Sequence, residues 1–320
     1  MDRIDIFPKG KQQFKVNLHA HTNVSDGKFS PEEVKAIYKA EGYDAVAFTD
    51  HRKCVPHPEL NDESFVALTG VELDFWETEE TGALSKAIHI NAIAFDPKLT
   101  YTMERNVPTT PNVAMDFDRA NTMIKELKDK GCYIILNHPV WSGMSNEDVE
   151  RVQHFDAMEV RNSVAVKYFQ CSDDSAHYQY YLRSGRKAAP VAADDCHYKR
   201  EDGSAGDEYC NGWVYVLADE LSYDGILQGL KKGDFYASTG PKIEDMYLEG
   251  DILHVLCSPV SDVILVERSI TRKERITART DSITHAKIDI SRIKAYSPFV
   301  WVTLRDSFGR QAWAMPYWFE

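Results

Sequence analysis

The sequence predicts a protein of the α/β class, in which a closed or nearly closed barrel of parallel strands precedes a small all-β domain. Three observations support this prediction. Short apolar runs alternate with helical segments from residue 14 to about residue 232, and such alternation is typical of a parallel sheet. After Gly240-Pro241 only strand-like runs follow. Histidines and carboxylates cluster where the predicted strands end, which is where a barrel of this kind holds its functional residues.

Apolar and β-branched runs mark the strands of the first region. They cover residues 15–18, 45–48, 65–71, 88–95, 133–136, 157–160 and 189–193. One helix is expected to begin at residue 30, and four others are expected to cover residues 118–130, 146–154, 174–184 and 221–232. About seven strand–helix repeats are enough to close, or nearly close, a barrel.

Capping residues support the helix boundaries. Ser30 is a suitable N-cap for the first helix, Pro31 fits the first helical position, and Glu33 completes a capping box. Gly42 is expected to end this helix, and Gly233 the last one, because glycine adopts the left-handed conformation that often follows a helix.

The pattern changes after residue 240. The β-type runs there cover residues 243–248, 252–257, 263–267, 285–290, 299–305 and 311–315. Helical character is limited to a charged stretch at residues 272–275. The sequence therefore predicts a barrel domain at residues 1–240 and a small β-sandwich-like domain at residues 241–320. Aromatic residues of this second domain are expected to pack against the barrel rather than to form a carbohydrate-binding or dimerisation surface: Trp301, Trp313, Tyr317, Trp318 and Phe319.

The composition limits the classes of partner. Lys and Arg number 37 against 50 Asp and Glu, which gives a formal net charge of −13. This balance argues against bulk nucleic-acid binding, because phosphate backbones bind to basic surfaces. A small phosphorylated substrate remains compatible, because bound divalent cations reverse the local charge. No run approaches the roughly 18 apolar residues of a membrane span, and no apolar signal core follows Met1. With six scattered cysteines, a cytoplasmic protein with free thiols is expected, and its oligomeric state is left open.

Nine potential metal ligands recur in short clusters along the first region, each near the end of a strand-like run. They are His19, His21, Asp26, His51, Glu72, His89, His138, Asp195 and His197. Imidazole and carboxylate ligands together suit Zn, Mn or Fe, and more than six ligands exceed what a single ion takes. The sequence therefore predicts a site for more than one divalent ion.

Strand geometry assigns roles within these clusters. Side chains two residues apart on a strand point to the same face, so His19 and His21 can reach one ion. Adjacent side chains point opposite ways, so His51 is the expected ligand and Asp50 is expected to support the ligands. Glu72 can bridge two ions with its two carboxylate oxygens. By the same alternation, Asp194 is expected to face away from the ligands.

Other candidates fit this pattern less well. Cys196 and Cys210 lie near the last cluster and are alternative ligands, but thiolates are not needed to complete the set. Four histidines stand outside the clusters and are expected to be ordinary surface or core residues: His154, His177, His254 and His285.

Short motifs surround most of these ligands. They read His19-Ala-His21, Asp26-Gly27, Thr49-Asp50-His51, Gly70-Val-Glu72, Asn137-His138-Pro139 and Asp195-Cys-His197. In kind and order they resemble the motifs of the PHP (polymerase and histidinol phosphatase) superfamily, over roughly residues 14–235. The region from Tyr236 onward resembles the β-rich extension of some PHP-type phosphoesterases.

The resemblance implies a distorted (β/α)7 TIM-like barrel that holds three divalent ions, of Mn, Fe or Zn. One ion would be held by His19, His21, Glu72 and Asp195. A second would share Glu72 and bind His89 and His138. A third would be held by Asp26, His51 and His197. Cys196 and Asp194 replace the small or hydroxyl residues that are usual in the family, but neither change removes a ligand.

Clustered divalent ions suit the hydrolysis of a phosphate ester, because they generate hydroxide at neutral pH and neutralise phosphate oxygens. The hydroxide is expected to bridge the ions that share Glu72, with Asp195 also at the reacting centre. Arg161 follows a predicted strand and is the expected phosphate-binding cation, since guanidinium binds phosphate through two parallel hydrogen bonds. An ion pair between Arg161 and either Glu159 or another local acid is the alternative.

The predicted function is therefore metal-dependent hydrolysis of a small phosphorylated metabolite, either a phosphomonoester or a nucleotide-type ester. An amidohydrolase-like enzyme that cleaves a non-phosphate ester or amide is one alternative, although no lysine stands at a predicted strand end to act as a carbamate ligand. A non-catalytic metal-binding module is the other, and the complete ligand set argues against it. Trp141 is expected either to stack on a base or sugar or to pack at the barrel rim.

Overall fold

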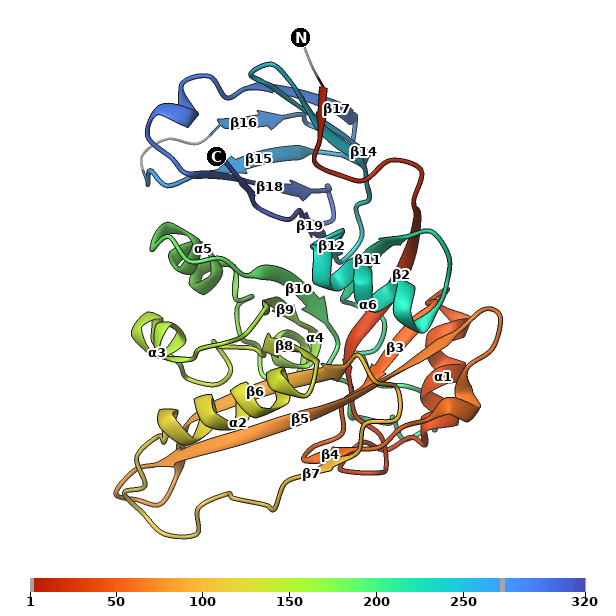
Figure 1. Cartoon of the computed structure of the whole chain (residues 1–320), viewed down its shortest axis with the longest axis vertical. Coiled ribbons are helices and arrows are strands. Elements are labelled where there is room, and N and C mark those ends of the chain that lie inside the picture. The colour runs from red at the N-terminus through yellow and green to blue at the C-terminus, as the bar shows by residue number, and fades with distance from the viewer. Residues whose placement is uncertain (1–2, 271–273, 320) are drawn as a thin grey trace.

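The structure, a computed structural model, describes residues 3–270 and 274–319 (Figure 1). Up to residue 240 its strands are β1 (Arg3–Asp5), β2 (Gln12–Ala20), β3 (Ala45–Phe48), β4 (Lys53–Cys54), β5 (Val66–Thr78), β6 (Leu84–Ala94), β7 (Tyr101–Thr102), β8 (Cys132–Leu136), β9 (Ala157–Asn162), β10 (Ala189–Ala193), β11 (Trp213–Ala218) and β12 (Phe235–Ser238). The later strands are β13 (Ile243–Glu249), β14 (Ile252–Val260), β15 (Asp262–Val266), β16 (Glu274–Thr277), β17 (Ile283–Asp289), β18 (Phe299–Arg305), β19 (Gln311–Trp313) and β20 (Tyr317–Trp318).

The α-helices of the described residues are α1 (Pro31–Ala40), α2 (Phe117–Asp129), α3 (Asn146–Arg151), α4 (Ser163–Lys167), α5 (Ser175–Arg183) and α6 (Tyr223–Lys232). The capping box of α1 forms as predicted: the Ser30 hydroxyl accepts a hydrogen bond from the Glu33 amide, and the Glu33 carboxylate accepts one from the Ser30 amide. Helix α6 ends at Gly233, whose φ is 78°. None of the described helices combines the length and the apolar character that crossing a membrane requires.

A 14-stranded sheet is the main element of the mixed α/β fold, with strand order β10-β9-β8-β6-β5-β3-β2-β11-β12-β19-β18-β15-β16 and β20 beside β18. Strands β2, β3 and β5 are parallel, as are β8, β9 and β10. Strand β6 is antiparallel to both β5 and β8, because a short turn joins β5 and β6 into a long hairpin (Figure 1). The prediction of an all-parallel sheet is therefore wrong, and the described strands do not form a closed barrel.

Strands β10 and β2 flank the part of the sheet that runs from β10 through β9, β8, β6, β5 and β3 to β2. The chain segments at the ends of these two flanking strands nevertheless approach each other. Ala20 and Cys196 form an isolated parallel bridge. The Asp195 amide donates to the His19 carbonyl at 2.9 Å, and the His21 amide donates to the Cys196 carbonyl at 3.2 Å. These hydrogen bonds bring the first and last ligand clusters of the chain together.

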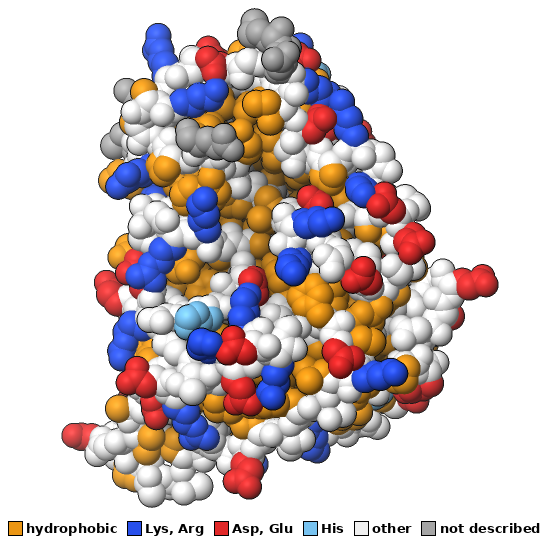
Figure 2. All heavy atoms as spheres, in the orientation of Figure 1, with side chains coloured by type: hydrophobic (Ala, Val, Ile, Leu, Met, Phe, Trp, Pro, Cys, Tyr) orange, Lys and Arg blue, Asp and Glu red, His pale blue; other side chains and the backbone are white. Residues whose placement is uncertain are grey.

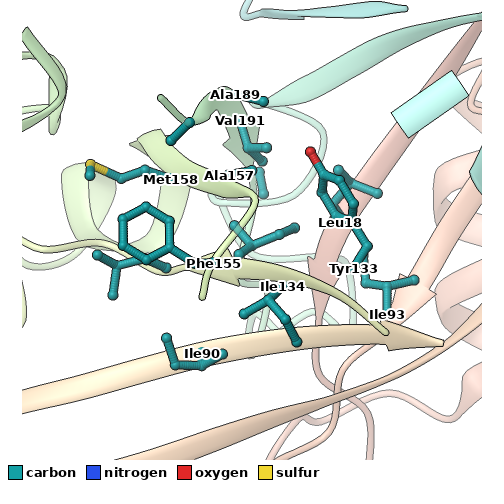
Figure 3. Close-up of a cluster of buried hydrophobic side chains, with 14 of the residues drawn as sticks. Leu18, Ile90, Ile93, Tyr133, Ile134, Phe155, Ala157, Met158, Ala189 and Val191 are labelled. Atoms are coloured by element: carbon teal, nitrogen blue, oxygen red, sulfur yellow. The ribbon is translucent and has the colours of Figure 1, made fainter. Parts of the chain in front are cut away.

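Apolar side chains from five strands hold this curved part of the sheet together. Figure 3 shows them as a buried cluster: Leu18 of β2, Ile90 and Ile93 of β6, Tyr133 and Ile134 of β8, Ala157 and Met158 of β9, and Ala189 and Val191 of β10. Burying one such Leu or Ile side chain contributes about 1.5–3 kcal/mol. Because protein interiors are close-packed, the strand ends above this core are held firmly relative to one another.

The region after residue 240 is built from β-strands, as predicted, but its strands are divided between two sheets. Strands β15, β16, β18 and β19 continue the large sheet through the pairing of β12 with β19. Strands β13, β14 and β17 form a separate sheet, in which β1 from the N-terminus pairs with β13. Residues 274 and 275 of the charged stretch expected to be helical belong to strand β16, and residues 272 and 273 lie outside the described residues. The division at residue 240 stays a prediction.

The aromatic side chains of the C-terminal strands are partly or wholly buried. Trp301 and Trp313 are fully buried, and the Trp301 ring lies 4.9 Å from that of Tyr178 in α5. Tyr317 and Trp318 are half-buried. On the face of the molecule shown in Figure 2, acidic and basic side chains are interspersed around a central band of apolar surface.

Candidate metal centre

The structure brings all nine predicted ligands together in three overlapping groups. The first contains His19, His21, Glu72 and Asp195, the second Glu72, His89 and His138, and the third His21, Asp26, His51 and His197. Within each group, the potential ligand atoms lie within 4.8 Å of one another. These are the sets that the resemblance implies, with His21 added to the third.

The first group is buried where β2 and β10 meet. The Nε2 atoms of His19 and His21 lie 3.1 Å apart, and Asp195 Oδ1 lies 3.1 Å from each of them. Glu72 closes the group, with Oε1 3.4 Å from His19 Nε2 and Oε2 3.2 Å from His21 Nε2. Asp195 Oδ1 is buried without a hydrogen-bond partner. Leaving such an oxygen unsatisfied is costly, and a cation bound between these four side chains would satisfy it.

Glu72 connects the first group to the second. Its Oε1 lies 3.0 Å from His89 Nδ1 and 3.6 Å from His138 Nε2, whereas its Oε2 lies 3.1 Å from His51 Nδ1. His89 Nε2 is buried and has no hydrogen-bond partner. The two oxygens of Glu72 therefore face different sets of histidines, which is the arrangement that a bridging carboxylate requires.

The third group is the most open. Asp26 Oδ1 lies 3.5 Å from both His21 Nδ1 and His197 Nε2, and its Oδ2 lies 3.7 Å from His51 Nε2. The Asp26 side chain is 53% exposed. His197 Nδ1 lies 2.7 Å from the Asp195 carbonyl oxygen, which can only accept a hydrogen bond. The proton of a neutral His197 therefore belongs on Nδ1, and Nε2 presents a lone pair to the group.

Two of the ligands lie within strands rather than at strand ends. Strand β5 continues beyond Glu72 to Thr78, and His89 lies in the middle of β6. In the hairpin, Glu72 is opposite Asn91 and His89 is opposite Asp74, so the two ligands are diagonal neighbours on one face. The hairpin can extend past the parallel strands because its two strands satisfy each other's backbone hydrogen bonds.

Glu159 in β9 is fully buried and orients two of the ligands. Its Oε1 accepts a hydrogen bond from His19 Nδ1 at 2.8 Å, and its Oε2 accepts one from the His138 amide at 2.9 Å. A carboxylate at Nδ1 fixes the proton there and leaves Nε2 free for a metal ion. Sequence analysis did not assign Glu159 to the site. Its position inside an apolar strand could have indicated this role. A carboxylate buried in such a strand needs hydrogen-bond or charged partners, and histidines can supply them.

Replacing Glu159 by glutamine is expected to weaken metal binding by about 10- to 100-fold, because a His19 ring without its carboxylate partner loses basicity and orientation. Titration of the metal-free protein with Mn²⁺ or Zn²⁺ by calorimetry measures this change. The exposed Glu147→Gln variant is the matched control and is expected to bind as the wild type does. Unchanged affinity in Glu159→Gln would show that the hydrogen bond to His19 does not support metal binding.

Two further aspartates lie beside the candidate ligands in the sequence and accept hydrogen bonds from neighbouring loops. Asp50 accepts hydrogen bonds from the Thr22 amide at 2.8 Å and the Ser25 hydroxyl at 2.7 Å, and so orders the loop that carries Asp26. Asp194 faces away from the ligands, as alternation predicts, and accepts a hydrogen bond from the Gly212 amide at 2.7 Å. Burial raises the pKa of Asp194 to about 6, although its hydrogen bonds oppose the rise.

The carboxylates create a strongly negative field around the histidines. Burial by itself would lower the pKa of His21, but Asp195 and Glu72 outweigh it and raise that pKa to about 10. The pKa of His19 is raised well above its usual value in the same way. For His51, burial dominates and lowers the pKa to about 4. A field that retains protons on buried imidazoles also favours divalent cations, which displace those protons on binding. The donor set and its charge therefore fit a centre with several ions.

A cavity of about 290 Å³ opens onto these groups. Seven of the predicted ligands line it: Asp26, His51, Glu72, His89, His138, Asp195 and His197. The remaining lining includes the aromatic residues Trp76, Trp141, Phe169 and Tyr198 and the cations Arg52 and Arg105. Trp141, predicted to stack on a ligand or to pack at the rim, is half-buried in this lining.

Arg161 is not among the described residues that line the cavity, contrary to the expectation that it faces the site. A bulge in β9 explains the difference: Val191 of β10 is opposite Glu159, but the next residue, Ala192, is opposite Arg161. The extra residue turns Arg161 away from Glu159. Burial lowers the pKa of Arg161, and the nearby charges of Asp173, Asp194 and Asp174 oppose that shift.

The cavity draws its two arginines from elsewhere. Arg52, directly after the ligand His51, has a left-handed backbone with φ of 61° and donates from Nη1 to Asp74 Oδ2 at 2.6 Å. Arg105 is exposed on the loop after β7. Neither arginine was predicted to face the site, because neither directly follows a predicted strand. Their presence at the cavity agrees with the tendency of loops to carry functional residues.

Comparisons with known proteins were made at three levels. No family model matches the sequence, and no curated protein matches it. A two-domain protein from Bacteroides vulgatus that contains a predicted PHP-like metal-dependent phosphoesterase is 16% identical, with a TM-score of 0.44, and the match covers 98% of this chain and 97% of that one. A protein from Bifidobacterium adolescentis described as a metal-dependent phosphoesterase is 14% identical, with a TM-score of 0.41, over 60% of this chain and 91% of its own.

An amidohydrolase from Chromobacterium violaceum is also similar in structure. It is 14% identical, with a TM-score of 0.40, and the match covers 69% of this chain and 96% of that one. The first of these similarities extends over almost the whole of both chains. The chain is similar in structure to each of these three proteins at low sequence identity.

Proposed function

We propose that this chain is a hydrolase of small phosphate esters that depends on three divalent ions of Mn, Fe or Zn. The observation that carries the proposal is the convergence of nine imidazole and carboxylate ligands, in three groups that share Glu72 and His21, on a cavity that also contains two arginines. Donors of this kind and number suit several borderline-hard ions rather than one.

The residues of the site would divide the work. The ions, when bound by the three groups, lower the pKa of water and offset the negative charge of the phosphate. Glu72 holds the groups at a fixed separation through its two oxygens. Glu159 keeps the proton of His19 on Nδ1, so that Nε2 is available as a ligand. The open third group, with the exposed Asp26, gives the substrate access to the centre.

Arg105 and Arg52 are the cations that we assign to the phosphate, in place of Arg161. Guanidinium groups bind phosphate oxygens through parallel hydrogen bonds, and both side chains line the cavity beside the ligands. Arg52 is already oriented by its hydrogen bond to Asp74. The exposed Arg105 is free to close on a bound substrate.

The test is phosphate release from a panel of phosphomonoesters and nucleotide bisphosphates by protein loaded in turn with Mn, Fe or Zn. We expect turnover of at least one ester, and its loss in the Asp195→Asn variant. If the metal-loaded protein releases phosphate from no member of the panel, the phosphoesterase proposal fails. A second panel, of non-phosphate esters and amides, then tests an amidohydrolase-like activity. Metal binding without turnover of any compound in either panel indicates a non-catalytic module.

Replacing Arg105 by alanine is expected to lower kcat/KM for phosphate esters by about 10- to 100-fold, because a charge-assisted hydrogen bond to phosphate contributes about 1.5–3 kcal/mol. Steady-state kinetics of the metal-loaded variant measures the loss. The Arg161→Ala variant is the matched comparison and is expected to keep its kcat/KM if it folds. A loss confined to Arg161→Ala would return the phosphate-binding role to that residue.

A further inference from the structure

We propose that the cavity selects phosphate esters whose alcohol part carries a flat aromatic ring, which binds against a wall formed by Trp76, Trp141 and Phe169. This inference rests on the proposed function and names its substrate class. In this arrangement, the phosphate lies at the ligand groups and the ring of the alcohol lies along the wall.

The wall begins at the metal ligands and continues outward. The Trp141 ring centroid lies 4.9 Å from that of His138 and 5.4 Å from that of His89. The Trp76 ring centroid lies 5.0 Å from that of His89 and 6.4 Å from that of Trp141, and the Phe169 ring centroid lies 5.7 Å from that of Trp141. All three aromatic residues line the cavity. A ring attached to a phosphate at the ligands therefore meets aromatic surface directly.

Aromatic side chains are also exposed at the same place. Among the described residues, Phe169 is 51% exposed, Tyr168 41% and Tyr198 37%. Phe169 and Tyr198 line the cavity, and the rings of Tyr168 and Tyr198 lie 4.5 Å apart. Contiguous apolar surface left in water marks binding sites more often than isolated exposed residues do. Because this surface continues into the cavity as far as the ligands, it favours a small molecule over a protein as the occupant.

One ring of the wall, that of Trp76, is held in position before anything binds. Trp76 donates from Nε1 to Asp74 Oδ2 at 2.7 Å, and Arg52 donates to the same oxygen at 2.6 Å. A preorganised ring loses little conformational freedom on binding. The cavity volume of about 290 Å³ lies at the lower end for small-molecule sites, about 300–1,000 Å³, and suits a phosphate with one ring system.

Benzyl phosphate and cyclohexylmethyl phosphate test the proposal, because they have the same number of carbon atoms and both release a primary alcohol, but only the first carries a flat ring. For the metal-loaded wild-type protein, we expect kcat/KM to favour benzyl phosphate by about tenfold, as one or two aromatic contacts imply. The Phe169→Leu and Trp141→Leu variants are expected to lose most of this preference while turnover of cyclohexylmethyl phosphate persists. Phe308→Leu, an exposed residue outside the cavity lining, is the control.

A second measurement separates this proposal from the proposed function. Binding of benzylphosphonate and cyclohexylmethylphosphonate, followed by calorimetry on the metal-loaded protein, reports the ring preference without any turnover. If neither ester is hydrolysed but benzylphosphonate binds about tenfold more tightly, the phosphoesterase function fails and the aromatic site stands. The aromatic site is overturned if the wild type hydrolyses and binds the aromatic and the saturated compounds equally well. It is also overturned if the preference for the aromatic compound is unchanged in both Phe169→Leu and Trp141→Leu.

Discussion

Replacing Glu72 by glutamine is expected to reduce phosphate release by at least about a thousandfold, which corresponds to roughly 4 kcal/mol of lost transition-state stabilisation. The physical reason is the position of Glu72 between the groups: Oε1 faces His19, His89 and His138, and Oε2 faces His21 and His51. Glutamine has nearly the same shape, but it carries no charge and offers only one acceptor oxygen. One substitution therefore weakens more than one ion site.

Steady-state kinetics and the metal content per chain measure this effect together. The control is Glu80→Gln, which changes an exposed glutamate at the turn of the same β5–β6 hairpin and is expected to leave both quantities unchanged. A Glu72→Gln protein that keeps a normal metal content and a tenth or more of the wild-type activity would contradict the bridging role of Glu72.

Removing the metal ions is expected to lower the thermal unfolding midpoint by roughly 10 °C. A ligand that binds only the folded state at a thousand times its Kd stabilises that state by about 4 kcal/mol, and each kcal/mol shifts the Tm of a domain of this size by about 2–4 °C. The structural reason is that buried groups such as Asp195 Oδ1 and His89 Nε2 have no other partner. Scanning calorimetry with and without a chelator measures the shift. Glu72→Gln is expected to lose most of it.

The size of this shift is expected to increase from pH 6 to pH 9. In the metal-free protein, His19 and His21 have raised pKa values, about 10 for His21, so their protonated forms stabilise the fold. That stabilisation is fully present below the unfolded pKa of about 6.5 and is lost as the pH rises through the folded pKa. Metal ions must displace these protons, so they add least at low pH. A Tm shift that is constant over this range would contradict the protonation of the two histidines.

The sequence predicted the candidate ligands because most of them belong to a short local pattern. His19 and His21 lie on one face of a strand by simple alternation, and their Nε2 atoms converge to 3.1 Å in the structure. His51 and His138 likewise follow the ends of β3 and β8. The three groups of candidate ligands in the structure are those that the resemblance to PHP proteins implies, with His21 added to the third.

Residues that act through contacts between distant strands were harder to identify. Glu159 lies 140 positions from His19 in the sequence, yet the two side chains are 2.8 Å apart. Arg52 and Arg105 enter the cavity from loops, for which no strand-end rule applies. Arg161 was assigned to the site because it directly follows a predicted strand, but β9 continues through Arg161 to Asn162 and contains a bulge before it.

The amino-acid sequence by itself determined the α/β class, the capped helix α1, the β-rich C-terminal region and the choice of candidate metal ligands, because hydrophobic period, capping and short motifs act over a few residues. Only the tertiary structure decided that β6 runs antiparallel, that the described strands leave the barrel unclosed, and which arginines and carboxylates reach the site. These features depend on pairing registers and hairpin lengths, which are set by contacts between segments far apart in the chain.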